Sequence, residues 1–440
     1  EYFHNWTGNR ITCRDWFQLS LKEGLTVFRD QQFSGDMRSH AVKRIEDVLT
    51  LRARQFREDA GPLAHPVRPE SYVEINNFYT ATVYEKGAEL IRMMRLLVGE
   101  DRYRAALDLY FDRHDGQACT IEDWVAVFEE AAGRDLSQFK RWYEQAGTPT
   151  VTLQEDWEDG TLTLSLRQHT VPTPGQPLKE PLLIPVALGL IGPDGAELLP
   201  TQVLELDSPE QVFTFTGLSA RPVVSALRGF SAPVALEHDQ SSAARATLLA
   251  HDTDPFARFE AGRNVARDIL HAMVLDGAAL DPNYLDAMRR VLTDDSLDPA
   301  FRTLVLRLPA EDDLAQSLHA GGHTPDPDAI HTARRSALHT LANTLATDLT
   351  RVVGDMATPG PYNPDARDAG RRALRLAAAS LLAHADGGES ARAIYHAADN
   401  MTEQFGAWCA LLTVGAGDAE SQHFHRQWQD ERLVMDKWFA

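Results

Sequence analysis

Hydrophobic and polar positions change their period twice along the chain, and these changes predict three regions of different structure. In residues 1–147 the apolar side chains recur at helical spacing. Two faces with this spacing are Phe17, Leu21, Leu25 and Phe28, and Val83, Leu90, Ile91, Met94 and Leu97. Because Gly147 and Pro149 then interrupt the pattern, we expect a mostly helical domain over residues 1–147.

From about residue 150 to 235 apolar and polar residues alternate, as in strands with one buried face. Residues 161–166 and 211–216 alternate cleanly, and turn clusters at 173–177 and 192–195 separate the runs. Residues 182–188 form a more continuous apolar run, in which Pro185 favours an edge position or a bulge. We therefore expect a small antiparallel β-sandwich domain over residues 148–240.

Beyond about residue 241 the strand pattern stops, and stretches rich in Ala, Leu and Arg follow. Three of these stretches, 256–275, 329–353 and 366–385, are long enough for helices, and Gly321–Pro327 is expected to be a loop. The sequence predicts an α-helical array over residues 241–440, of the kind formed by helix pairs, although no clean sequence repeat is visible. The fold class is thus multi-domain α+β.

Composition argues against several classes of partner. The chain has 43 Lys and Arg against 64 Asp and Glu, a net charge of −21. Because nucleic acids and anionic membrane surfaces both attract concentrated basic faces, we expect neither as a partner. No apolar run is long enough to span a bilayer, so we expect no membrane span.

The cysteines and tryptophans suggest structural roles. Cys13, Cys119 and Cys409 lie far apart and form neither a disulfide framework nor a CxxC pair, which favours reduced thiols and a cytoplasmic location. The tryptophans, Trp6 and Trp16 among them, have no basic neighbours that would make a base-stacking platform. We therefore expect them to be core residues.

The first four residues carry the strongest chemical signal. Glu1-Tyr-Phe-His4 has the form of the end of a His-Glu-x-x-His motif, whose first histidine would lie one position before Glu1. In that motif two histidines on one helical face bind zinc, and the glutamate serves as general base. Glu-x-x-His alone occurs in many helices by chance, so the interpretation depends on the residues that follow.

Eighteen residues separate His4 from Glu23, which would complete a His, His, Glu ligand set with an open fourth position. Asp30 lies about two helical turns after Glu23 on a similar face. It either accepts a hydrogen bond from a ligating imidazole or is a solvated charge at a helix end.

Longer segments carry a resemblance to a known family. Residues 1–30 resemble the zinc region of the aminopeptidase N enzymes of the bacterial alanyl branch, and Tyr72–Ala88 is similar to that family's second catalytic segment. Shorter matches are Arg113–Gly116, Trp142–Pro149 and Leu433–Phe439. The resemblance runs along the whole chain and implies a thermolysin-like catalytic domain in residues 1–147.

The resemblance also implies the roles of individual residues. His4 and Glu23 would be metal ligands for one Zn²⁺ per chain, and Glu1 the general base. Tyr84 would donate a hydrogen bond to the oxyanion, which stabilises charge present only in the transition state. Tyr79 would form a wall of the pocket for the substrate's first side chain, although it could equally be a core residue.

The function implied is that of a zinc metallo-aminopeptidase, a protease that releases single residues, Ala and basic residues preferentially, from peptides with a free N-terminus. The family further implies a cytoplasmic monomer. Its amino-group-binding loop, its first zinc histidine and its N-terminal β domain have no counterpart here. We therefore expect a chain truncated at both ends and inactive by itself. The alternatives are a thermolysin-type endopeptidase and a non-catalytic helical scaffold or pseudoenzyme.

Overall fold

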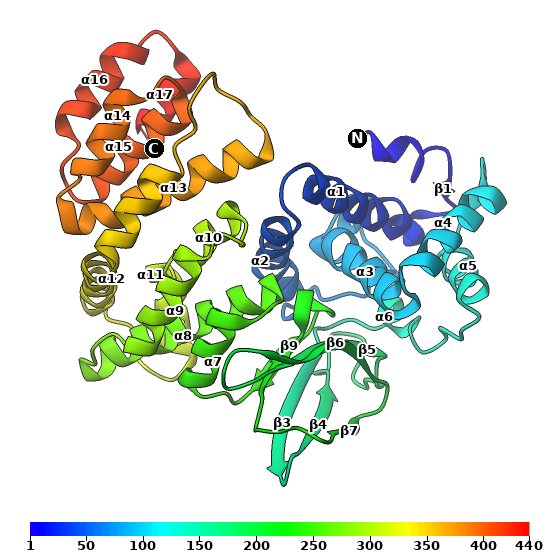
Figure 1. Cartoon of the computed structure of the whole chain (residues 1–440). Helices are drawn as coiled ribbons and strands as arrows, with labels where there is room; N and C mark the ends of the chain where they lie inside the picture. Colours follow the sequence, from blue (N-terminus) through cyan, green and yellow to red (C-terminus); the bar gives the residue numbers. More distant parts are fainter. Residues whose placement is uncertain (440) are drawn as a thin grey trace. The chain divides into compact units, whose positions relative to one another are not determined.

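The computed structural model describes residues 1–439, which form two compact units (Figure 1). Unit one comprises residues 1–241 together with 251–257, and unit two comprises residues 242–250 together with the chain from residue 258 onward. Within residues 1–439 no helix has the length and apolar character needed to cross a membrane. The division at residues 147 and 240 that the sequence suggests stays a prediction.

Unit one begins with a helical region. Its helices, with η for 3-10 helices and for the one π-helix η4, are η1 (Phe3–Asn5), η2 (Trp16–Leu21), α1 (Glu23–Met37), α2 (His40–Asp59), η3 (Ile75–Phe78), η4 (Thr82–Lys86), α3 (Gly87–Val98), α4 (Glu100–His114), α5 (Ile121–Ala132) and α6 (Arg141–Glu144). Two short strands, β1 (Thr12–Cys13) and β2 (Ala118–Cys119), pair in parallel. The predicted mostly helical start of the chain is confirmed.

Side-chain caps explain where several of these helices begin. The Asp15 carboxylate accepts from the backbone of Phe17 and starts η2, and the Ser39 hydroxyl accepts from Val42 and starts α2. A Thr120–Asp123 capping box starts α5. Because η2 and α1 are separate helices, the first predicted apolar face is divided between them, and Leu21, Leu25 and Phe28 from it are buried.

Two sheets follow the helical region in unit one. Their strands are β3 (Thr150–Glu158), β4 (Thr161–His169), β5 (Ile184–Ile191), β6 (Glu197–Leu206), β7 (Glu210–Phe215), β8 (Val223–Ala226) and β9 (Ala235–His238), with the short 3-10 helix η5 (Arg228–Phe230) after β8. One sheet has the order β7-β4-β3-β9 and the other β6-β5-β8. All neighbours are antiparallel except β3 and β9, because β9 returns to the first sheet alongside β3. Leu162, Leu164 and Leu166 alternate into the core as predicted.

Pro185 stands in a central strand, β5, where the sequence favoured an edge or a bulge. A proline is nevertheless tolerated at this point of a central strand, because β8 pairs with β5 only over Leu188–Ile191. At Pro185 the neighbour is β6 alone, through Glu205, so the missing N–H leaves no second ladder incomplete. Register shifts also occur in β5, but further along, around Leu190.

Unit two consists of helices, and α7 begins in it and ends at the boundary with unit one. The bounds are α7 (Ser242–His251), α8 (Pro255–Asp276), α9 (Pro282–Thr293), α10 (Pro299–Val305), α11 (Glu311–Ala320), α12 (Pro327–Asp355), α13 (Ala366–Asp386), α14 (Glu389–Ala397), α15 (Met401–Thr413), α16 (Asp418–Trp428) and α17 (Arg432–Phe439). The long helices α12 and α13 pack side by side, and α13 also packs against α10 and α15 (Figure 1). The predicted helical array and the loop between α11 and α12 are confirmed.

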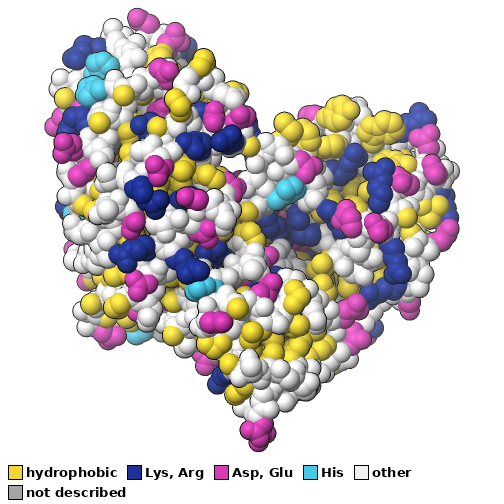
Figure 2. All heavy atoms as spheres, in the orientation of Figure 1, with side chains coloured by type: hydrophobic (Ala, Val, Ile, Leu, Met, Phe, Trp, Pro, Cys, Tyr) yellow, Lys and Arg dark blue, Asp and Glu magenta, His cyan; other side chains and the backbone are white. Residues whose placement is uncertain are grey.

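The expectation that the tryptophans are core residues is wrong for two of them. Trp124, Trp142 and Trp408 are buried, whereas Trp6 and Trp16 are 50% and 43% exposed. Both exposed rings belong to the segments around η1 and η2. Apolar side chains are likewise exposed near the N-terminus in Figure 2.

Candidate active site

Glu1 and His4 lie on one tight turn at the start of unit one. The expected helix is short here, because only Phe3–Asn5 form η1. The His4 N–H nevertheless donates to the Glu1 carbonyl at 3.2 Å, the bond pattern of a 3-10 helix. Side chains at i and i+3 eclipse in that geometry, so Glu1 and His4 occupy the same side of the turn. Glu1 itself is exposed.

His4 and Glu23 come together although they are far apart in the sequence. His4 Nε2 lies 3.4 Å from Glu23 Oε2, and the Glu23 side chain is only 7% exposed. Glu23 is the first residue of α1, and a contact of 3.1 Å between the Thr7 and Thr26 hydroxyls holds α1 against the turn after η1. Lys22 Nζ stands 3.9 Å from the other carboxylate oxygen of Glu23.

The second nitrogen of His4 is held from behind by α1. Its Nδ1 lies 3.3 Å from the Thr26 hydroxyl and 3.4 Å from the Thr7 carbonyl oxygen. Because a carbonyl can only accept, a proton on Nδ1 suits this surrounding, and Nε2 is the nitrogen on the side of Glu23. Asp30, considered from the sequence for a contact with a ligating imidazole, is exposed, and Thr26 occupies the position beside His4.

Tyr84 reaches Glu23 from η4. Partial burial raises the pKa of its phenol, and the negative charge of Glu23 and a hydrogen bond to that carboxylate raise the pKa further. The phenol therefore keeps its proton at neutral pH and is available as a hydrogen-bond donor.

Two glycines, which the sequence analysis did not single out, allow Tyr84 to approach Glu23. A Cβ on Gly24 would stand 2.9 Å from the carbonyl carbon of Gly87, so α1 and the start of α3 cross where neither carries a side chain. The Ser20 hydroxyl adds a hydrogen bond of 3.0 Å to the Val83 carbonyl. Each glycine is close in sequence to a predicted site residue, Gly24 to Glu23 and Gly87 to Tyr84.

Tyr79 lies beside Tyr84 in an exposed aromatic group. Its ring centroid is 6.4 Å from that of Tyr84 and 6.3 Å from that of Trp16, and Tyr79 is 52% exposed. The exposed faces of Tyr79 and Trp16 therefore form an apolar wall next to the phenol of Tyr84. Of the five predicted site residues, the structure brings His4, Glu23, Tyr84 and Tyr79 into one row of contacts, with Glu1 on the turn that carries His4.

The pair of His4 and Glu23 fits two ligands of a zinc ion. An imidazole nitrogen and a carboxylate are the donors found in catalytic zinc sites, and a held Nδ1 leaves Nε2 free to coordinate. Residues 1–439 contain no group of three or more His, Cys, Asp and Glu side chains arranged to hold a metal. Within the described residues, His4 and Glu23 are therefore the two donors that fit a zinc ion.

Family models cover the three parts of the chain in succession. Residues 1–143 match the peptidase family M1 domain, residues 147–239 a domain of unknown function (DUF3458) with an Ig-like fold, and residues 242–440 a domain of unknown function (DUF3458_C) with ARM repeats. The class defined by the fold and the site is thus a family M1 peptidase domain followed by an Ig-like domain and a helical repeat.

Comparisons that cover the whole chain identify individual aminopeptidases to which it is similar. The chain is 51% identical to an aminopeptidase N of Caulobacter vibrioides and 42% identical to that of Escherichia coli, in both cases over 100% of this chain and 52% of the relative. A crystal structure of Legionella pneumophila aminopeptidase A in complex with aspartic acid matches with a TM-score of 0.82 and 26% identity, over 100% of this chain and 51% of the other. The chain belongs to the aminopeptidase N family and spans about half the length of the curated relatives it matches. The resemblance found in the sequence and the predicted fold class are confirmed.

Proposed function

We propose that this chain carries residues of the active site of a zinc-dependent aminopeptidase, which removes single residues from the N-termini of peptides. The observation that carries the proposal is the separation of 3.4 Å between His4 Nε2 and Glu23 Oε2, beside the Tyr84 phenol. Aminopeptidase N relatives at 51% and 42% identity support it.

His4 and Glu23 would hold the zinc ion, His4 through Nε2 and Glu23 through its carboxylate. When bound, zinc polarises a carbonyl group and lowers the pKa of water. Thr26 and Thr7 keep the His4 ring oriented for this role, since both contact Nδ1.

Glu1 transfers a proton, while Tyr84 and Tyr79 contact the peptide. Glu1 accepts the proton of the attacking water and returns it to the amine that leaves. The Tyr84 hydroxyl donates a hydrogen bond to the oxygen that becomes negative in the tetrahedral intermediate. Tyr79 contributes an apolar wall for the side chain of the residue that is released.

The proposal includes finer points that the family implies: one zinc ion per chain, a preference for Ala and basic residues, and a monomer in the cytoplasm. The inactivity expected of the 440-residue chain alone also stays a prediction. It is tested by assaying that chain beside a protein of the length of its curated relatives that contains it, called the full-length protein below.

The test compares the hydrolysis of Ala-p-nitroanilide and of its N-acetylated form by the full-length protein, with and without a zinc chelator. We expect turnover of the free-amine substrate only, with loss on chelation and recovery on adding zinc. Cleavage of both substrates would instead indicate a thermolysin-type endopeptidase. If neither substrate is cleaved and the protein binds no zinc, a non-catalytic scaffold becomes the better proposal.

A further inference from the structure

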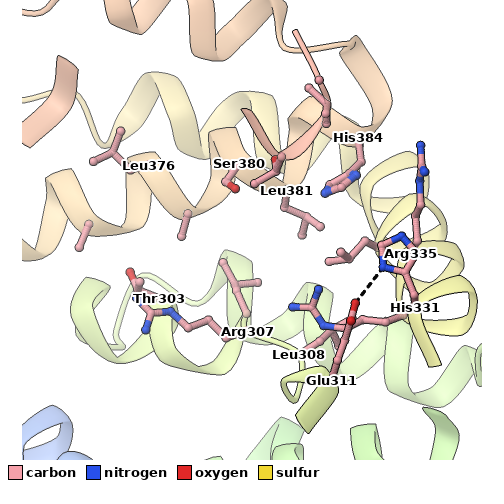
Figure 3. A pocket seen from close by; sticks show the side chains of 18 of the residues that line it. Thr303, Arg307, Leu308, Glu311, His331, Arg335, Leu376, Ser380, Leu381 and His384 are labelled. Carbon is pink, nitrogen blue, oxygen red and sulfur yellow. Dashed lines mark hydrogen bonds and ion pairs between the residues drawn. The ribbon is translucent and has the colours of Figure 1, made fainter. Parts of the chain in front are cut away.

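A cavity of about 900 Å³ lies within unit two, among side chains of α10–α13 and residues at both ends of α15 (Figure 3). None of the five predicted site residues belongs to its lining. Its volume falls in the range of small-molecule sites, about 300–1,000 Å³. The cavity can therefore accept a ligand of several residues' size.

One side of the cavity is apolar. Leu376 and Leu381 line it from α13, Leu338 from α12, and Leu308 from the segment after α10. The Ser380 hydroxyl lies between the two α13 leucines in sequence and faces the same cavity (Figure 3). An occupant would thus bury apolar groups while keeping a hydrogen-bond partner.

The charged part of the lining is mostly basic. Three guanidinium groups, those of Arg307, Arg334 and Arg335, line the cavity together with a single carboxylate, that of Glu311. Glu311 is already engaged, because its Oε1 lies 3.0 Å from Nδ1 of His331 (Figure 3). This excess of arginines over carboxylates is unusual in a chain of net charge −21.

In the part of the chain that the structure describes, none of these three arginines has a carboxylate partner, and Arg334 donates instead to the Pro309 carbonyl. Elsewhere in unit two arginines pair with acids, as Arg375 does with Glu403 and Arg392 with Glu420. Within residues 1–439 neither Arg307 nor Arg335 makes an ion pair, although both are exposed and acidic residues outnumber basic ones. Their charge is therefore available to an anion.

The pKa of His384 is lowered by burial and partly by the same arginines. Burial lowers the pKa of its imidazole, and His339, Arg335 and Arg334 lower it further. Since both arginines act on a side chain that lines the cavity, their charges are felt inside it.

We propose that this cavity binds the C-terminal end of a short peptide, with its carboxylate on Arg335 and an apolar side chain against the leucines of α13. Guanidinium groups recognise carboxylates by charge-assisted hydrogen bonds. The Ser380 hydroxyl suits a peptide amide, which a simple fatty acid would not offer. The site goes beyond the proposed catalytic residues, and its occupancy requires no turnover.

The test is isothermal titration calorimetry of the 440-residue chain with acetyl-Ala-Ala-Leu, in the presence of a chelator. The acetyl group and the chelator keep the proposed aminopeptidase site from contributing, so the result is separable from that of the activity assay. We expect binding of the free carboxylate and an affinity lower by at least about tenfold for acetyl-Ala-Ala-Leu-amide, the effect of losing one charge-assisted hydrogen bond.

Three variants locate the binding. Arg335→Gln should weaken it about tenfold, because it removes the charge and keeps a polar side chain. Ser380→Trp should abolish it by placing a bulky ring between the α13 leucines where the peptide's apolar side chain would lie. The matched control is Arg426→Gln, which changes an exposed arginine of α16 outside the cavity and should leave the affinity unchanged. Circular dichroism melting verifies that each variant is folded.

Equal binding of the acid and the amide, or equal binding by Arg335→Gln and the unaltered chain, would overturn the proposal. So would binding of decanoate without binding of the peptide, since the cavity would then take a simple amphipathic anion. The titration is repeated on the full-length protein, where loss of peptide binding would equally overturn the assignment.

Discussion

The two nitrogens of His4 illustrate how single side chains prepare a metal ligand. Nε2 faces Glu23, while Nδ1 contacts Thr26 and the carbonyl of Thr7. A histidine that ligates a metal is usually fixed by a group on its other nitrogen. Thr26, on α1 one turn after Glu23, therefore orients the ring from the same helix that carries the second ligand.

Replacing Thr26 by Val should weaken zinc binding without unfolding the protein. Valine has nearly the same shape as threonine but offers no hydroxyl to Nδ1, and the loss of such a contact reduces metal affinity by about 10–100-fold. The measurement is a competition titration of the full-length protein against a zinc chelator. Thr26→Ser should restore the affinity, and Thr350→Val, on an exposed face of α12, is the control. An affinity unchanged in Thr26→Val would contradict the positioning role.

Tyr84→Phe tests the proposed oxyanion donor. Phenylalanine keeps the ring packed beside Tyr79 but removes the hydroxyl, so we expect kcat to fall by about 10²–10³. KM for Ala-p-nitroanilide should change by no more than a few-fold, since the donor acts in the transition state. Tyr362→Phe, an exposed tyrosine of unit two, serves as the matched control. A rise in KM with kcat preserved would instead assign Tyr84 to substrate binding.

The sequence predicted site residues better than the residues that support them. His4, Glu23 and Tyr84 belong to residue types that carry chemistry and stand in segments with a resemblance to a known family. Thr26 has neither signal, because a threonine inside a helix is common and its contact with His4 depends on tertiary packing. The sequence instead suggests Asp30 as the residue that contacts the imidazole, but Asp30 is exposed on α1.

At the scale of elements, the crossing of α1 and α3 sets the position of the site. Gly24 and Gly87 meet at the crossing, and the absence of both side chains lets η4 bring Tyr84 to Glu23. A glycine normally weakens a helix by about 1 kcal/mol relative to alanine, so its presence within α1 indicates a packing requirement.

Gly24→Ala should therefore destabilise the protein, the opposite of the usual effect in a helix. The new Cβ would lie 2.9 Å from the Gly87 carbonyl carbon. Relieving this overlap should cost about 1–3 kcal/mol and move Tyr84 away from Glu23. Thermal melting and kcat of the full-length protein measure the two effects.

The control is Gly354→Ala in α12, where a Cβ would meet nothing within 4 Å. There we expect a neutral or slightly stabilising change, because only helix propensity is altered. If Gly24→Ala is equally neutral, the close crossing does not govern the position of Tyr84.

Element types could be predicted from the periodicity, while their pairing could not. The alternation of Leu162, Leu164 and Leu166 indicated β4 correctly, yet the parallel pairing of β3 with β9 depends on contacts far apart in the sequence. Pro185 showed where a ladder is incomplete, but not that β5 is central in its sheet.

At the scale of the whole molecule, buried ion pairs join the helices of unit one to its strands. Lys86 and Asp59 are 1% exposed each, with Nζ 2.8 Å from Oδ2. Lys86 also donates to the Gly147 carbonyl at 2.9 Å, and the Thr148 hydroxyl donates to Asp59 at 2.9 Å. The pair thus connects α2 and η4 to the segment that enters β3. Sequence reasoning could not identify it, since nothing in a chain with 64 acidic residues marks one buried carboxylate.

Lys86→Met should remove this connection and reverse the pH dependence of the contribution that Asp59 makes to stability. Burial alone would raise the pKa of Asp59, but the charge and hydrogen bond of Lys86 hold it below its ordinary value. In the unaltered protein Asp59 therefore stabilises the fold above its ordinary pKa of about 4, and the contribution is lost as the pH falls. Without Lys86, burial raises the pKa, so the fold is favoured at low pH and loses stability as the pH rises.

Urea unfolding of Lys86→Met at pH 4.5 and pH 7 distinguishes this account from simple loss of packing. At pH 7 the variant leaves a buried carboxylate without a cation, and we expect a loss of about 3–5 kcal/mol in the free energy of unfolding. At pH 4.5 the loss should be smaller, because Asp59 can take up a proton. Lys86→Met/Asp59→Asn should recover part of the stability at pH 7, since no charge is then buried alone. A loss that is equal at both pH values and in both variants would mean that Lys86 acts through its packed side chain, with its charge making no difference.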